Sequence, residues 1–161
     1  MIYHIRNKTV NDLFINISHF LDHFIMLIFA KAAYDAGKFF GLTNDEIIIY
    51  GTLSFLFFGA FAPLASYLAD KFSRALMMVI YHFGIGFASI AAGLSINLTM
   101  FSSSLAFIGA FTAIYHPVGI AMLLSKNERT GFRLGINGVF GNMGVAAAPL
   151  VVGAILLLGN W

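Results

Sequence analysis

Three ionisable side chains lie close together near the amino terminus of this 161-residue chain. His19, Asp22 and His23 follow one another at i, i+3 and i+4, a spacing that places them on one face of an α-helix. Asp12 and Asn16 extend the same face, whereas most of the opposite face is Phe, Leu and Ile. Aspartate and histidine change charge near working pH when burial shifts them, which makes this face a candidate proton or substrate pathway. The alternative is a set of satisfied hydrogen bonds between helices.

A second group of polar residues lies farther along the chain. Tyr115 and His116 immediately precede Pro117, which removes one backbone hydrogen bond, so that a freed carbonyl can face a cavity or a ligand. A simple kink with a locally bonded imidazole is the alternative. Asn137 and Asn142 can hydrogen-bond across helices or to a substrate. All five residues therefore belong to the candidate pathway or to the kink beside it.

Several glycines accompany these asparagines. Gly138, Gly141 and Gly144 give the helix a smooth face, which favours close packing against a neighbour. Pro63 and Pro149 lie in two similar segments, 60–64 and 146–150, which differ at a single position. We expect these prolines to bend equivalent helices of two three-helix units, an internal repeat that is typical of transporters.

Metal binding and enzymatic chemistry find less support. His19 and His23 have the spacing of a metal or haem pair, but no third ligand follows at a recognisable spacing, and the chain has no cysteine. We therefore expect no metal and no cofactor. A membrane subunit that binds haem or metal through His19, His23, His82 and His116 is kept as a minor interpretation. The sequence has no phosphate loop and no credible Ser-His-Asp arrangement, so we do not expect an enzyme.

The composition determines the class of protein that holds these residues. Sixty per cent of the residues are hydrophobic and ten per cent are charged, which indicates an all-α membrane protein rather than a soluble domain. The net charge of +2 does not indicate nucleic-acid binding, because the basic residues lie in short turns. Five spans are predicted, at about 13–34, 47–69, 75–96, 100–124 and 134–158. A loop is expected from Lys38 to Glu46, with Thr43 capping the second span.

The distribution of Lys and Arg predicts the orientation. One side of the predicted topology carries Arg6, Lys8, Lys71, Arg74, Lys126, Arg129 and Arg133. The other side carries only Lys31 and Lys38. We therefore expect a cytoplasmic amino terminus, with Trp161 at the outer face. The odd number of spans and the abrupt end suggest a truncated chain.

The charged turn between the second and third spans resembles a known signature. The segment 68–74 resembles the loop 2–3 motif of the major facilitator superfamily, although Ser66 and Ser73 replace two glycines of that motif. The resemblance implies that Asp70 and Arg74, with Lys71 between them, brace neighbouring helix ends and help to latch the outward-facing state. It also implies a six-helix half bundle, built from a 3+3 inverted repeat, whose sixth helix is missing here.

Three shorter motifs are similar to the fosmidomycin-resistance branch of that superfamily. They are His19-x-x-Asp22, His116-Pro117, and Gly141-Asn142-x-Gly144 followed by Pro149. The resemblance implies a secondary active transporter that moves a small organic solute by alternating access, with proton-coupled efflux as a narrower hypothesis. The implied partners are the lipid bilayer, the solute, protons and a missing carboxy-terminal half, in a bacterial-type plasma (inner) membrane. The alternative is a non-transporting helical membrane module or a truncated fragment that needs a partner half.

Overall fold

A computed structural model describes residues 2–125 and 129–159 of the chain, and within these ranges it is helical without any strand. The helices are α1 (Ile2–Phe40), α2 (Asn44–Lys71), α3 (Arg74–Gly93), α4 (Leu98–Thr112), α5 (Tyr115–Leu124) and α6 (Thr130–Leu158). The predicted all-α class is therefore confirmed. The predicted places of Lys126 and Trp161, and of the side chains of Arg6, Lys8 and Lys31, lie outside the described part of the chain.

Five helical stretches are long and apolar enough to cross a membrane. They are Asn11–Ala30, Asn44–Lys71, Arg74–Gly93, Leu98–Leu124 and Thr130–Leu158. They follow the predicted order, and large apolar side chains such as Phe83, Phe87 and Leu158 project from them at the surface. Such a surface suits hydrocarbon, because helices satisfy their own backbone groups and leave only side chains to face lipid.

The connection between the first two spans is shorter than expected. Helix α1 continues through Lys38 to Phe40, and only Gly41–Thr43 separate it from α2, so the predicted loop from Lys38 to Glu46 is wrong. Helix α2 begins where expected because Thr43 caps it. The Glu46 carboxylate accepts a hydrogen bond from the Thr43 backbone N–H at 2.8 Å, and the Thr43 hydroxyl accepts one from the Glu46 N–H at 3.4 Å.

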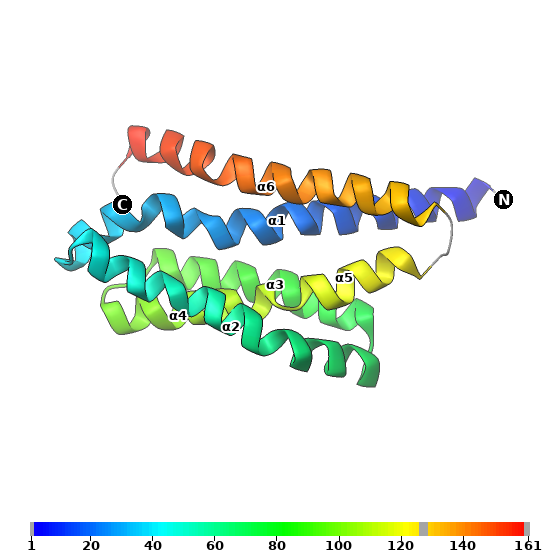
Figure 1. The fold of residues 1–161 in the computed structure, drawn as a ribbon, viewed down its shortest axis with the longest axis horizontal. Coiled ribbons are helices and arrows are strands. Elements are labelled where there is room, and N and C mark those ends of the chain that lie inside the picture. Colours follow the sequence, from blue (N-terminus) through cyan, green and yellow to red (C-terminus); the bar gives the residue numbers. More distant parts are fainter. Residues whose placement is uncertain (1, 126–128, 160–161) are drawn as a thin grey trace.

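Successive spans reverse direction, as Figure 1 shows. The start of α1, the α2–α3 turn and the α5–α6 connection lie at one end, which we call the basic end because Lys71, Arg74 and Arg133 flank these connections. Helices α1 and α6 run side by side in the same direction, and α4 packs between α2 and α3. Both α2 and α6 continue through Pro63 and Pro149, so a bend at these prolines stays a prediction.

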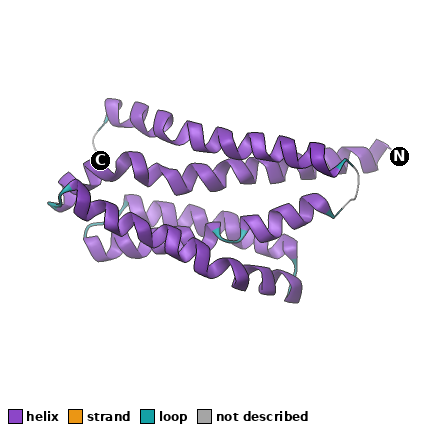
Figure 2. Ribbon diagram, in the orientation of Figure 1, coloured by secondary structure: helices purple, strands orange, loops and turns teal. Residues whose placement is uncertain are grey.

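The fourth span is broken near the middle of the bundle. Helix α4 ends at Thr112 and α5 begins at Tyr115, and Figure 2 shows the loop between them inside the molecule. Pro117 has no N–H that could donate to the carbonyl of Ala113. Just before it, the amide of Ile114 donates to the carbonyl of Phe111 at 3.1 Å, which is three residues back rather than the four of an α-helix. The predicted span over 100–124 is therefore one crossing, Leu98–Leu124, made of two helices. The break frees the first turn of α5, which carries Tyr115 and His116, to face α1.

Candidate functional site

Four ionisable side chains from two helices meet beside the α4–α5 break. His19, Asp22 and His23 come from α1, and His116 comes from the first turn of α5. We call this group the histidine cluster. One nitrogen from each of the three histidines lies within 4.8 Å of the others, and the Nε2 atoms of His19 and His23 are 3.1 Å apart. The structure thus brings together residues that are almost one hundred positions apart in the sequence.

Asp22 is the most deeply buried member of the cluster. Its side chain is 1% exposed, and its Oδ2 atom lies 3.4 Å from Nε2 of His116. Its Oδ1 atom is buried and has no hydrogen-bond partner among the described residues. A buried polar atom without a partner costs free energy, and such atoms are uncommon in native proteins. The cluster therefore has an unused acceptor that a proton, a cation or a solute can satisfy.

Asn137 of α6 holds the cluster from one side. Its backbone carbonyl accepts a hydrogen bond from Nδ1 of His19 at 2.8 Å. Its side-chain amide donates to Oδ1 of Asn16 and to the hydroxyl of Tyr115, each at 2.9 Å. Since a carbonyl only accepts, Nδ1 of His19 carries a hydrogen, and in the neutral ring Nε2 keeps its lone pair. That lone pair points toward His23.

Ring contacts fix the orientation of the imidazoles. The buried ring of Tyr115 stacks on His19 with centroids 4.9 Å apart. His116 meets His19 and His23 edge to face, at 5.3 Å and 5.5 Å between ring centroids. The hydroxyl of Tyr115 also donates to the carbonyl of Ile15 at 3.1 Å. These contacts tie α5 to α1, so the His116 ring is presented to the cluster by a positioned backbone.

Close packing between α1 and α6 makes these contacts possible. A Cβ atom at Gly144 would lie 2.2 Å from the carbonyl oxygen of Phe20, and one at Gly141 would lie 2.7 Å from the His19 ring. Neither position therefore accommodates a larger residue without movement. Gly138 differs, because a Cβ atom there would have nothing within 4 Å, so the expected packing role does not apply to it among the described residues.

An ion pair closes the same interface toward the basic end. Arg133 of α6 donates from Nε and from a terminal nitrogen to the two carboxylate oxygens of Asp12 on α1, at 2.9 Å and 2.6 Å. The side chains are only 14% and 29% exposed. A bidentate contact of this kind fixes the register of the two helices and also stabilises their packing. In the sequence, Arg133 was used only as a positive charge that predicts the orientation, and its ion pair with Asp12 was not predicted.

Several predicted site residues lie elsewhere. Asn142 is exposed on α6 and makes no contact with the cluster. Asp70, Lys71 and Arg74 lie at the α2–α3 turn. A terminal nitrogen of Arg74 lies 4.0 Å from Oδ1 of Asp70, and both side chains are exposed. The ammonium group of Lys71 lies about 6 Å from the ring centroids of Tyr67 and Phe72. The turn is thus separate from the histidine cluster.

Two findings concern residues that the sequence analysis set aside. Tyr81 of α3 is not among the predicted site residues, yet it is fully buried, and its hydroxyl donates to the carbonyl of Ser18 at 2.8 Å. The expectation of no metal relied on the lack of a third ligand, and His116 supplies one from a different helix. His82 is not part of the cluster, because its Nε2 lies 3.2 Å from the hydroxyl of Ser18, while its Nδ1 donates to the carbonyl of Met78 at 2.7 Å. That ground for excluding a metal therefore fails, and the four-histidine interpretation loses one member.

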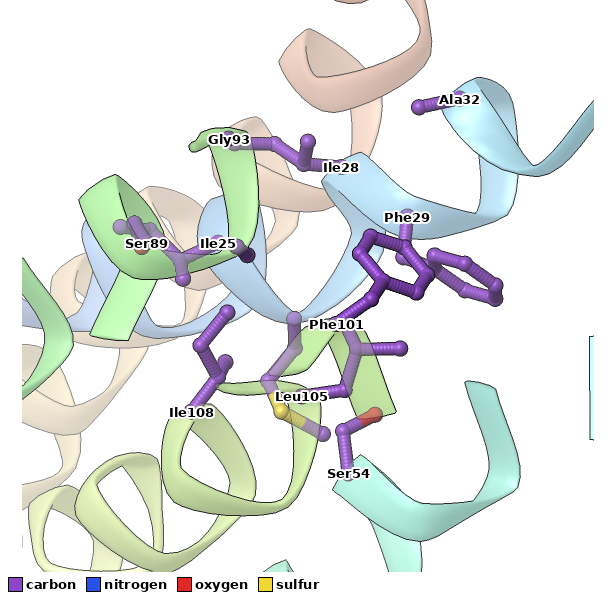
Figure 3. Close-up of a pocket in the computed structure, with 12 residues that line it drawn as sticks. Ile25, Ile28, Phe29, Ala32, Ser54, Ser89, Gly93, Phe101, Leu105 and Ile108 are labelled. Atoms are coloured by element: carbon purple, nitrogen blue, oxygen red, sulfur yellow. The ribbon is translucent and has the colours of Figure 1, made fainter. Parts of the chain in front are cut away.

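An apolar cavity lies one helical turn beyond the cluster along α1. It has a volume of about 210 Å³, and Figure 3 shows Ile25, Phe29, Phe101 and Leu105 among the side chains around it. The hydroxyl of Ser89, at its edge, is buried and has no partner among the described residues. The cavity therefore offers an apolar chamber with very few polar groups, next to an ionisable cluster.

Comparison with known proteins gives one match. A sequence model of the Major Facilitator Superfamily matches residues 13–161. This range includes the whole histidine cluster and the α2–α3 turn. No similar protein was found among curated proteins, and none among solved structures.

Proposed function

Because the chain belongs to the major facilitator superfamily of membrane transporters, we propose that it is the solute-handling part of a secondary active transporter. In this proposal a small organic solute crosses the membrane by alternating access. Supporting features are the five apolar spans and the polar cluster enclosed between α1, α5 and α6. Ionisable groups at bilayer depth are costly, and they are retained where they face water or a partner.

The observation that carries the proposal is the unpaired Oδ1 atom of Asp22. A carboxylate held in this state gains most from taking up a proton or from contact with a bound solute. The titratable groups around it are His116 on α5, whose Nε2 lies 3.4 Å from Oδ2, the hydroxyls of Tyr81 on α3 and Tyr115 on α5, and His19 and His23 on α1. We therefore assign the coupling proton to Asp22, with the histidines as its exchange partners.

The apolar cavity suggests what kind of solute is moved. Its walls are almost entirely aliphatic and aromatic, and it begins at Ile25 and Met26, within one turn of His23 on α1. A molecule with one polar or charged end and a small apolar body fits this combination, because the polar end can satisfy the cluster and the body can fill the cavity. Proton-coupled efflux, in the manner of the fosmidomycin-resistance branch, is the specific form that we propose.

The charged turn has a separate role in the proposal. Asp70, Lys71 and Arg74 are exposed at the end where Arg133 also lies. We assign this end to the cytoplasm of a bacterial-type inner membrane, in agreement with the distribution of Lys and Arg. The turn then latches the outward-facing state from the cytoplasmic side.

A second helical half completes the solute path in this proposal. His23 and His116 are half-buried, and the side chain of His116 is 33% exposed, so the cluster is open on one side of the described helices. A polar site that is open to lipid is unfavourable, and a second wall would enclose it. The same exposure fits the alternative, a module that does not transport and only assembles with a partner.

Transport by the reconstituted full-length protein tests the role of Asp22. Proteoliposomes are loaded with a candidate solute, and uptake or efflux is followed while the pH on each side is varied. We expect Asp22→Asn to abolish the acceleration of transport by a pH gradient, because the amide cannot exchange a proton. Asp35→Asn is the matched control, since it removes a carboxylate from the same helix outside the cluster. Asp35→Asn should leave the gradient response unchanged.

Two outcomes would count against the proposal. An Asp22→Asn protein that transports with the wild-type pH dependence would remove Asp22 from proton coupling. A correctly inserted wild-type protein that moves none of a broad panel of amphipathic solutes would favour the non-transporting module.

A further inference from the structure

The three histidines of the cluster form a set of ligands for a metal ion. We propose that His19, His23 and His116 bind a divalent first-row transition metal ion such as Zn²⁺, with the carboxylate of Asp22 beside them as a source of negative charge. One nitrogen of each ring lies within 4.8 Å of the others, and the two α1 histidines have the i, i+4 spacing that puts two ligands on one helix face. This inference goes beyond transport and does not depend on it.

The protonation state of His19 is the one that a metal ligand needs. Its Nδ1 donates to the backbone carbonyl of Asn137 at 2.8 Å, which leaves the lone pair of Nε2 facing the cluster. Histidines that bind metals commonly donate their second N–H to a carbonyl or carboxylate, because this contact fixes the tautomer and the ring orientation. The outer contact of a metal site is therefore already in place.

The distances are close to those of a bound metal. With Zn–N bonds of about 2.0–2.1 Å in tetrahedral geometry, two ligand nitrogens are separated by about 3.3 Å. The Nε2 atoms of His19 and His23 are 3.1 Å apart. The third nitrogen lies within 4.8 Å, so the His116 ring has to approach by about 1.5 Å at most. The His116 side chain is 33% exposed, which leaves its ring room for such a movement while the backbone of α5 stays in place.

Asp22 supplies the negative charge beside the three nitrogens, although its carboxylate is not one of the ligand atoms that lie within 4.8 Å of one another. Its Oδ1 atom is buried without a partner, and its Oδ2 atom lies 3.4 Å from His116. A divalent cation beside this carboxylate would remove the cost of the unpaired oxygen. Three imidazoles beside one carboxylate suit Zn²⁺, Ni²⁺ or Cu²⁺, whereas Mg²⁺ and Ca²⁺ prefer sites made only of oxygen.

An ion has a route to the site. His116 and His23 are partly exposed, so the cluster is reached from one side of the helices without unfolding. Asp22 and His19 form the closed side. The cluster therefore has a buried side and a partly exposed side, and an ion can reach its ligands from the exposed side.

Zinc titration of the full-length protein tests the proposal. The protein is purified in detergent with an affinity tag that lacks histidine, stripped of metal with a chelator, and titrated with Zn²⁺ in a calorimeter. We expect one Zn²⁺ per chain, and no binding of Mg²⁺ or Ca²⁺ under the same conditions. Co²⁺ should give the intense visible absorption of a four-coordinate site with nitrogen and oxygen ligands.

Variants identify the ligands. His23→Gln and His116→Gln should each weaken Zn²⁺ binding by roughly 100-fold or more, since even contacts behind a ligand are worth 10–100-fold. His82→Gln is the matched control, because His82 lies outside the cluster and bonds to Met78. Circular dichroism and size-exclusion chromatography establish that each variant folds. Should a variant misfold, X-ray absorption of the zinc-loaded wild type provides the imidazole count directly.

The results that would overturn the proposal are specific. Absence of stoichiometric Zn²⁺ binding by the folded wild type would do so, as would wild-type affinity in both ligand variants or fewer than two imidazoles in the absorption spectrum. Because none of these measurements involves transport, failure of the metal site leaves the transport proposal intact. Failure of the Asp22→Asn transport test likewise leaves the metal site intact.

Discussion

Replacing Asn137 by alanine should destabilise the helix bundle measurably. The change removes two hydrogen bonds, from the side-chain amide of Asn137 to Asn16 and to Tyr115, each 2.9 Å long. Hydrogen bonds between membrane helices contribute about 0.6 kcal/mol on average and up to about 1.7 kcal/mol, so the two together amount to about 1–3 kcal/mol. The carbonyl contact with His19 is made by the backbone and survives the change.

Reversible unfolding of the protein in mixed micelles, followed by circular dichroism during titration with a denaturing detergent, measures this loss. Asn142→Ala is the matched control, because it removes an exposed asparagine from the same helix and should change the free energy of unfolding by less than about 0.5 kcal/mol. A double-mutant cycle with Asn16→Ala separates the hydrogen bond from the cavity that alanine leaves. We expect a coupling of at least about 0.5 kcal/mol. Strictly additive effects of the two single changes would refute the assigned contact.

Two further predictions concern the α1–α6 interface. Gly144→Ala should cost about 1–3 kcal/mol in the same unfolding assay, because the new Cβ would meet the carbonyl of Phe20 at 2.2 Å. Gly138→Ala, with open space around it, should be neutral or stabilising, and equal costs at the two sites would contradict the packing. Breaking the Arg133–Asp12 pair with Arg133→Gln should cost about 1–3 kcal/mol, between the values for exposed and buried pairs. Exchanging the two charges should restore part of the loss, and a failure of the exchange to improve on Arg133→Gln would argue against a direct pair.

Local patterns in the sequence predicted the features that depend on one helix. The spacing of His19, Asp22 and His23 placed them on one face, and that face does turn toward other helices. Thr43 was recognised as a cap because capping depends on residues three positions apart. The loop before it was predicted too long, because Lys38 was taken as its first residue, whereas α1 continues through Phe39 and Phe40 and ends just before Gly41.

Features that depend on contacts between two helices could not be predicted from local patterns in the sequence. His116 joins His19 and His23 only because α5 packs against α1 beside the break, and no periodic pattern records that contact. Asn137 and Asn142 were treated alike, yet five residues on a helix correspond to about 140° of rotation, so the two side chains face different directions. Attention to this rotation would have separated the buried asparagine from the exposed one.

The polar network divides into a satisfied part and an unsatisfied part, and the division lies at the helix break. Toward the basic end, the polar groups of Asn137 that face α1 and α5 are paired, and they hold the helices in register. On the other side, Asp22 keeps a buried oxygen without a partner, next to two partly exposed histidines. Packing alone would favour removing such a carboxylate, because an apolar side chain of similar size would avoid its cost. A scaffold that holds His19 and Tyr115 in place while leaving one carboxylate oxygen of Asp22 without a partner is suited to a species that arrives and departs, and both the proton and the metal ion proposed here have that property.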